Sequence, residues 1–109
     1  MKKVVTILCV MLFLFFNAKS SEYIHQIFIL NEGYFDYSSN QIVEPVTIGV
    51  YKPSDDSYSI VDTIENARFA SDLTVYGDFF YVAADNQLLK YDVNNYDLVA
   101  SQNIDGIRN

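Results

Sequence analysis

The single histidine of the chain, His25, is the first residue to test for catalysis or metal binding. Zinc-type sites need several His or Cys ligands at close spacing, and the one cysteine, Cys9, lies far from it in an apolar stretch. Nucleophilic catalysis by a Ser-His-Asp set needs an activating base beside an exposed serine, and no nucleophile-elbow sequence accompanies His25. The sequence therefore predicts no catalytic residue, no metal ligand and no cofactor, and it does not indicate an enzyme.

Acidic residues gather in two predicted turns. One turn holds Asp55 and Asp56, and the other holds Asp92, Asn94 and Asp97. Calcium binds several carboxylate and carbonyl oxygens at once, but neither turn has the alternating Asp-x-Asp-x-Asp-Gly pattern. Asp and Asn side chains also hydrogen-bond their own backbone in tight turns. Turn formation is the favoured interpretation, and a calcium site is the alternative.

Three aromatic residues, Tyr34, Phe35 and Tyr37, are the predicted ligand-binding residues. Aromatic faces with hydroxyl groups suit sugars and cofactors, and most of the other tyrosines fall within predicted strands, where they serve packing. These three stand in a predicted loop, residues 34–45, just beyond the end of a strand. Loops on a rigid scaffold commonly carry binding residues. The alternative is that the three rings only tuck the loop against the body.

The elements that would position these residues are clearest in the second half of the chain. Four short strands are predicted at residues 72–76, 79–84, 88–92 and 98–104, with Gly77-Asp78 as a two-residue hairpin turn between the first two. The run 79–84 has no polar face, which is typical of a strand covered on both sides. We interpret residues 68–104 as one four-stranded antiparallel blade of a β-propeller.

The first half resembles the same blade without its inner strand. Strands are predicted at residues 23–30, 46–51 and 58–64, and Tyr51 aligns with Tyr91 as Ile64 aligns with Ile104, both 40 residues apart. A spacing of this size occurs in propeller repeats, and chance similarity between two hairpins is the alternative. We expect an all-β fold of about one and three-quarter blades in an incomplete ring. Residues 21–67 form the first blade, residues 68–104 the second, and residues 105–109 the start of a further, truncated one.

The amino-terminal segment predicts secretion. Two lysines precede an apolar run over residues 4–16, and Ala18 and Ser20 are small residues at the positions a signal peptidase inspects. The run is too short to span a bilayer as a helix, which needs roughly 20 residues. Residues 1–20 are therefore a predicted signal peptide, and after cleavage the protein would be secreted, periplasmic or at the cell surface and not an integral membrane protein.

Loss of that segment would also change the charge. Three of the seven Lys and Arg residues go with it, which leaves four against 14 acidic residues and a net charge of −10. Nucleic acids and anionic membranes need clustered basic residues, so no nucleic-acid partner is expected. The excess of negative charge is consistent with solubility outside the cell.

Two sequence stretches resemble a known family: FILNEG at residues 28–33 and SDLTVYGDFFYVAADNQLLKYDVNNYDLVAS at residues 71–101. They are similar to the opening of secreted YncE-like β-propeller proteins (WD40/YVTN-like), in particular the Bacteroidetes-type group. The resemblance implies a propeller fold over most of residues 24–108. Some relatives bind vitamin B12-type corrinoids beside outer-membrane transporters. Those relatives are lipid-anchored, and this chain lacks the cysteine for that anchor.

Three functional hypotheses follow. The leading one is a non-enzymatic secreted propeller fragment that binds an unknown protein, glycan or small ligand. The second is a corrinoid-binding accessory of an outer-membrane transporter. The third is part of a propeller enzyme whose site lies beyond Asn109. Under all three, we expect the isolated chain to be aggregated or molten, because the outer faces of its two units would expose Phe28, Leu30, Phe80 and Val82.

Overall fold

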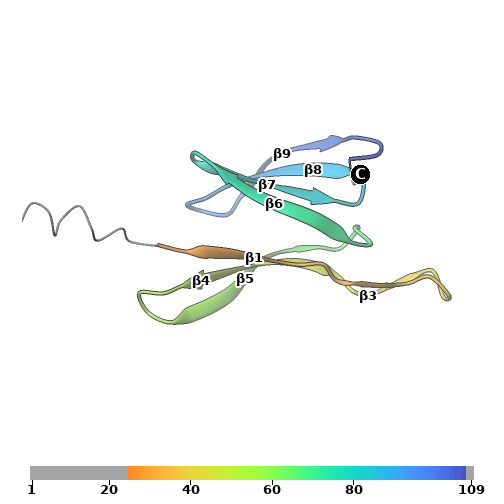
Figure 1. Ribbon diagram of the computed structural model, residues 1–109, viewed down its shortest axis with the longest axis horizontal. Helices are drawn as coiled ribbons and strands as arrows, with labels where there is room; N and C mark the ends of the chain where they lie inside the picture. Colours follow the sequence, from red (N-terminus) through yellow and green to blue (C-terminus); the bar gives the residue numbers. More distant parts are fainter. Residues whose placement is uncertain (1–24, 108–109) are drawn as a thin grey trace, which may run out of the picture.

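The computed structural model describes residues 25–107, which form nine β-strands and no helix (Figure 1). The strands are β1 (Ile27–Asn31), β2 (Tyr34–Asp36), β3 (Gln41–Glu44), β4 (Val46–Lys52), β5 (Ser57–Ile64), β6 (Ala70–Tyr76), β7 (Phe79–Ala84), β8 (Gln87–Asp92) and β9 (Leu98–Asn103). They make a three-stranded first sheet in the order β1-β4-β5, a two-stranded β2-β3 hairpin and a four-stranded second sheet in the order β6-β7-β8-β9. Every pairing is antiparallel, so the all-β class predicted from the sequence is confirmed.

The second sheet is a simple up-and-down meander, and its turns form where the sequence placed them. Gly77 takes a φ of +62° between β6 and β7, and Asp85 takes a φ of +54° between β7 and β8. Between β8 and β9, the Asp92 carboxylate accepts hydrogen bonds from the backbone N–H groups of Asn94 at 2.7 Å and Asn95 at 3.3 Å. These residues tolerate left-handed backbone or bond their own turn, which explains why each strand ends there.

The first sheet contains an insertion that the sequence did not predict. Residues 34–45 were expected to form a loop, and that prediction was wrong, because most of them form the β2-β3 hairpin between β1 and β4. Gly33 immediately precedes the β2-β3 hairpin and has a φ of +76°. A Cβ at this position would lie 2.6 Å from the carbonyl oxygen of Glu44. Only glycine fits where the two backbones come this close.

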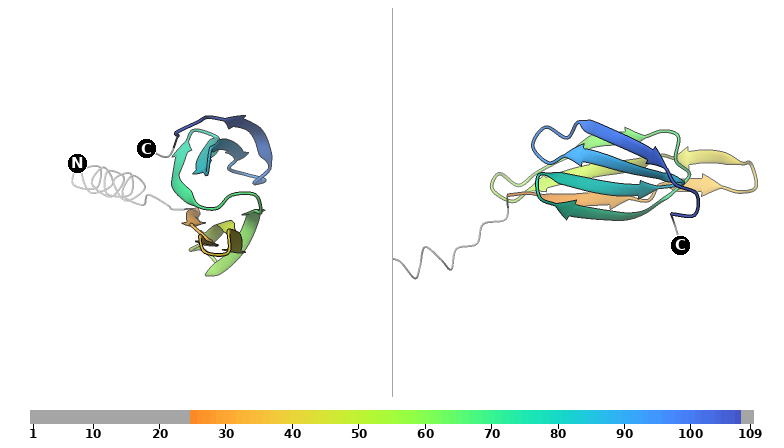
Figure 2. Two further views of the ribbon diagram at one scale, coloured as in Figure 1. Left: turned by 90° about the vertical axis from the view of Figure 1, so that its right-hand side faces the viewer. Right: turned by 90° about the horizontal axis from the view of Figure 1, so that it is seen from above.

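The two larger sheets pack face to face and share one core (Figure 2). Phe80 lies at its centre, with its ring 4.3 Å from that of Phe28 on the first sheet and stacked 4.9 Å from Tyr91 on its own sheet. The buried core residues come from both sheets and the connection between them: Val46, Ile48, Ile64, Ala67, Ala70, Phe80, Val82, Ala84, Leu89 and Tyr91. This shared core holds the sheets as a single body.

One prediction about the faces of the sheets was wrong. Phe28, Leu30, Phe80 and Val82 were expected on the outer faces, but Phe80 and Val82 are fully buried and Phe28 and Leu30 pack against the same core. Neighbouring residues of a strand point to opposite faces, so the alternate positions face outward. Ile27 and Ile29 are 43% and 38% exposed. All four predicted residues lie between the sheets because the two units meet through these faces.

Two predictions fall partly or wholly beyond the described residues. The predicted signal peptide, residues 1–20, lies outside them, as do residues 108 and 109 of the predicted further blade. Residues 105–107 form a turn after β9. Across residues 25–107, the chain has no helix of the length and apolarity that crossing a membrane requires.

Candidate binding surface

The three predicted ligand-binding residues lie together on the β2-β3 hairpin, which extends past the end of both larger sheets (Figures 1 and 2). Tyr34 and Phe35 belong to β2, and Tyr37 follows in the turn. The Tyr34 side chain is 55% exposed and that of Tyr37 is 71% exposed, while Phe35 is half-buried. Val43 on β3 adds a further apolar side chain that is 56% exposed. The hairpin thus presents an aromatic and aliphatic surface to solvent.

The hairpin turn is fixed by its own side chains. Asp36 accepts hydrogen bonds from the backbone N–H of Ser38 and the hydroxyl of Ser39, both at 3.0 Å. These bonds favour the charged carboxylate, and that of the Ser38 N–H is the largest cause holding the pKa of Asp36 below its ordinary value. Asn40 closes the turn with a φ of +56°, a conformation that Asn tolerates. The turn that carries Tyr37 is therefore locally ordered.

An arginine joins the base of the hairpin to the second sheet. Arg68, in the β5–β6 connection, donates from Nε and Nη2 to the two carboxylate oxygens of Asp85, both at 2.8 Å. The guanidinium carbon lies 5.9 Å from the ring centroid of Phe35 and 5.3 Å from that of Phe69. The hydrogen bond to Asp85 is the main cause that raises the pKa of Arg68. Arg68 is thus held as a permanent cation with a fixed orientation.

The aromatic rings continue this cluster outward from the arginine. Phe35 and Tyr37 meet edge to face, with ring centroids 4.9 Å apart and planes at 80°. The structure therefore brings two of the three predicted residues into contact, whereas Tyr34, the neighbour of Phe35 on β2, is exposed on the opposite face of the hairpin. We call Tyr34, Phe35, Tyr37, Val43 and Arg68 the hairpin surface. Tyrosine and arginine are the residue types enriched in protein interfaces.

Sequence reasoning missed the part played by Arg68 and Asp85. The two residues are 17 positions apart, and they meet because β6 and β7 pair antiparallel with Ala70 opposite Ala84, which brings the β5–β6 connection beside the β7–β8 turn. A second link supports this junction, since the backbone N–H of Asp85 donates to the carbonyl oxygen of Phe69 at 3.0 Å. The predicted hairpin around Gly77-Asp78 was the signal that could have found this pair.

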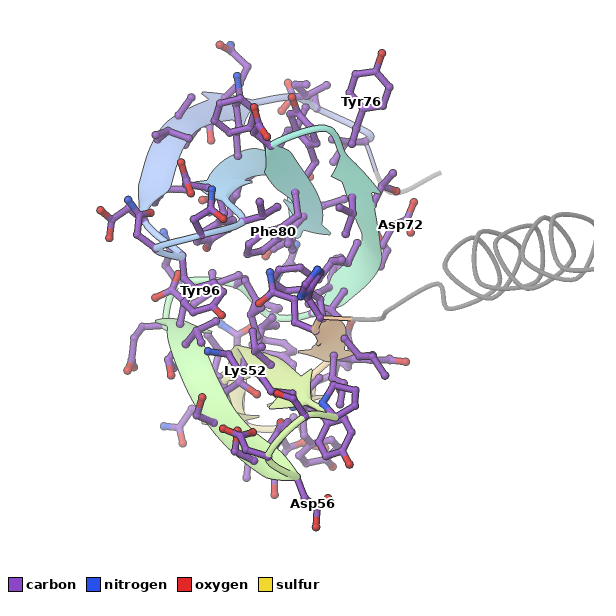
Figure 3. The ribbon with its side chains drawn as sticks, turned by 90° about the vertical axis from the view of Figure 1, so that its left-hand side faces the viewer. Lys52, Asp56, Asp72, Tyr76, Phe80 and Tyr96 are labelled. Atoms are coloured by element: carbon purple, nitrogen blue, oxygen red, sulfur yellow. The ribbon has the colours of Figure 1, made fainter. Side chains whose placement is uncertain are left out.

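The opposite end of the molecule has a cleft of about 590 Å³ between the two sheets. Figure 3 views this end, with Lys52 from the first sheet and Tyr96 from the second at the junction. Gln26 links the sheets here, because its side chain donates to the carbonyl oxygen of Val93 at 2.9 Å and accepts from the Tyr96 hydroxyl at 2.7 Å. Tyr96 has a φ of +64°, unusual for a bulky residue, and this bond and its edge contact with Phe28 hold it there.

Comparison with known proteins adds no identity. No family model, curated protein or solved structure matches this chain. The resemblance to YncE-like propellers stays a prediction.

The acidic turns and the histidine bring together no metal centre. Within the described part of the chain, no three His, Cys, Asp or Glu side chains are grouped to hold a metal ion. Asp55 accepts from the Ser57 hydroxyl at 2.7 Å, and Asp56 accepts from the Tyr51 hydroxyl at the same distance. Asp92 bonds its own turn as described above. Asp55 and Asp92 accept from backbone N–H groups of their own turns, those of Ser57 at 3.2 Å and Asn94 at 2.7 Å, as the turn interpretation expected, whereas Asp56 bonds a tyrosine side chain. His25 lines the cleft at the Lys52 end.

Proposed function

We propose that this chain is a non-enzymatic, secreted binding scaffold that recognises a protein partner through the hairpin surface. The observation that carries the proposal is the projecting β2-β3 hairpin with Tyr34 and Tyr37 more than half exposed on a body with a single core. Exposed apolar groups of this size on a stable scaffold are typical of contact surfaces. A convex hairpin fits the groove of another protein better than it encloses a small ligand, because small ligands bind in concave sites.

The rigidity of this surface supports the proposal. Binding costs less free energy when side chains are already ordered in the free protein. The Asp36 turn, the close backbone approach at Gly33 and the paired Arg68 restrict the hairpin from three sides. Arg68 also places a cation beside the two rings, where it can pair with an acidic or aromatic group of the partner.

We further propose that the two sheets are consecutive blades of a propeller-like array. Their ladders correspond strand by strand: Tyr51 pairs with Ile27 and Tyr58, and Tyr91 pairs with Phe80 and Leu98. Tyr91 faces the other sheet and is buried, whereas Tyr51 shares the outward face of its sheet with Ile27. Tyr51 and Tyr91 thus lie on the same side of their own sheets, as expected for propeller blades related by rotation about a common axis. In a sandwich with two-fold symmetry, the equivalent residues would face each other.

Site-specific photo-crosslinking tests the binding role. A benzoylphenylalanine placed at Tyr37 in the producing cell should give a crosslink to one partner protein. The same group at Tyr76, which is 77% exposed at the opposite end of β6, is the control and should not crosslink to that protein. Tyr76 stands opposite Phe79 on the outward face of the second sheet, so a crosslink from it to another copy of this chain does not bear on this test. The purified partner should then bind the double variant Tyr34→Ser/Tyr37→Ser at least about tenfold more weakly, as expected for interface tyrosines. Equal crosslinking of the same partner protein from both positions, or unchanged affinity of the double variant, would contradict the proposal.

A further inference from the structure

We infer that copies of this chain associate head to tail, the outward face of the second sheet in one copy packing on the outward face of the first sheet in the next. The inference rests on the proposed blade relation. It uses neither the hairpin surface nor its partner, so the two can fail separately. Each outward face is covered by a second copy of this chain. The reason is that the two outward faces correspond, residue by residue, to the two inward faces that already pack together within one chain.

The existing contact between the sheets has two different sides. The first sheet contributes Phe28, Leu30 and Ile48, and the second contributes Phe80, Val82 and Tyr91. The sides meet through the ring contact of Phe28 and Phe80 and through the Tyr91 hydroxyl, which donates to Asp62 at 2.6 Å. Because the two sides differ, this contact is heterologous, and such a contact can be repeated from one copy to the next.

The outward face of the second sheet corresponds to the inward side of the first. The two sheets can be superposed by aligning Tyr91 with Tyr51. In that alignment, Tyr81 and Ala83 on β7 correspond to Phe28 and Leu30 on β1, and Leu88 on β8 corresponds to Ile48 on β4. This face therefore repeats part of the apolar pattern that already covers a neighbouring sheet, with Lys90 in the place of the buried Val50. It also has a depression of about 200 Å³ lined by Tyr81, Leu88 and Lys90, into which a side chain of the next copy can insert.

The outward face of the first sheet corresponds in turn to the inward side of the second. Ile27 and Ile29 take the ladder places of Phe80 and Val82, and Tyr51 takes that of Tyr91. Gly49 stands where the second sheet has Leu89. A Cβ on Gly49 would lie 2.6 Å from Cζ of Tyr58, so the Tyr58 ring fills the space over this glycine. The face is thus apolar across its centre.

Exposure and charge agree with this pairing. Ile27, Ile29, Tyr58 and Ile60 are between 38% and 49% exposed on one outward face, and together they form an apolar patch of the kind that marks an interaction site. On the other face the ammonium of Lys90 lies 4.1 Å from the Phe79 ring centroid, which covers part of its charge. None of these residues is acidic, although the chain as a whole carries a net charge of −7. The carboxylates on the second-sheet face stand at its margins: Asp72 is on the edge strand β6, opposite Ala83, and Asp92 is at the end of β8, opposite Phe79.

The geometry makes a definite prediction about assembly. Each copy has one face of each kind, so association continues until the ring closes or a filament forms. If one copy supplies two blades and rings hold 4 to 8 blades, closed assemblies contain two to four copies.

Sedimentation of two complementary variants tests the inference. Ile29→Asp disables the outward face of the first sheet, and Leu88→Asp disables that of the second. Over about 1 to 100 µM, the range expected for interfaces of this class, the wild-type chain should form a discrete oligomer and each variant should be monomeric. An equimolar mixture of the two should form a one-to-one heterodimer and nothing larger, because one competent face remains on each chain.

Controls keep the outcome decisive. Val43→Asp places the same charge at an exposed apolar site on the hairpin, outside both faces, and should associate like the wild type. Circular dichroism identifies a variant that fails to fold, and the pair Ile60→Asp and Ala100→Asp, both at exposed positions, then replaces the first pair. A wild-type chain that stays monomeric, a mixture that does not form heterodimers, or single variants that still associate would overturn the inference.

Discussion

Tyr91 shows at the residue scale how the two sheets are joined. Its ring is 1% exposed and stacks on Phe80, and its hydroxyl reaches across to donate to Asp62 on the first sheet. Burial is the largest cause that raises the pKa of Tyr91, followed by the hydrogen bond to Asp62. The folded protein therefore favours the neutral phenol. The stability that Tyr91 contributes is fully present below the ordinary tyrosine pKa and is lost as the pH rises, because the phenol of the unfolded chain then ionises.

The Tyr91→Phe variant should therefore lose stability in a pH-dependent way. At pH 7 we expect its free energy of unfolding to fall by about 1.5 kcal/mol, the contribution of a hydrogen bond to a charged group. Above about pH 10 the unfolded tyrosine ionises first, so the wild type loses this contribution and its difference from the variant shrinks. Urea unfolding of both proteins at pH 7 and pH 10.5 measures this. A constant difference, or an equal effect of Tyr76→Phe at an exposed position, would contradict the expectation.

At the scale of elements, the sequence predicted the long strands well and the hairpin not at all. The strand at residues 79–84 has the predicted bounds, and the strands at residues 46–51 and 58–64 each extend by one residue in the structure. Those runs are long and apolar enough to show a pattern. β2 has three residues and β3 has four, too few for an alternation to be recognised. The Arg68–Asp85 pair follows from the register of the β6-β7 hairpin, in which Ala70 stands opposite Ala84, so the predicted hairpin at Gly77-Asp78 contained the signal for it.

The hairpin itself gives an element-scale prediction. Asp36→Ala removes the acceptor of the Ser38 and Ser39 hydrogen bonds, so the β2-β3 turn should exchange its amide hydrogens faster while β6 to β9 keep theirs. In the wild type, the Ser38 amide shift should titrate with a midpoint below the ordinary Asp pKa of about 3.9, because the lowered pKa keeps the carboxylate charged and bonded until the pH falls through it. Hydrogen exchange and an NMR titration measure both effects. Protection of the turn that is unchanged in Asp36→Ala would show that the carboxylate does not order it.

At the scale of the whole molecule, the shared core makes the two sheets one cooperative unit. Phe80 is fully buried and contacts Phe28 on the other sheet. Phe80→Ala should lower the free energy of unfolding by about 4 kcal/mol, as expected for a large buried ring. Hydrogen exchange should then rise in both sheets together. Faster exchange confined to the second sheet would show that the sheets unfold independently.

The open outward faces couple the stability of the whole molecule to its concentration. Head-to-tail contacts form only between folded copies, so association favours the folded state by mass action. The melting temperature of the wild type should therefore rise with protein concentration, on the order of 10 °C for a hundredfold increase in a chain of this size. The Ile29→Asp variant should melt at one temperature throughout, near that of the dilute wild type, whereas Val43→Asp should follow the wild type.

Scanning calorimetry over this hundredfold range of protein concentration separates specific association from the aggregated or molten state expected from the sequence. A molten chain gives no cooperative transition at any concentration. A cooperative wild-type melt that does not move with concentration would show that the outward faces remain uncovered in solution.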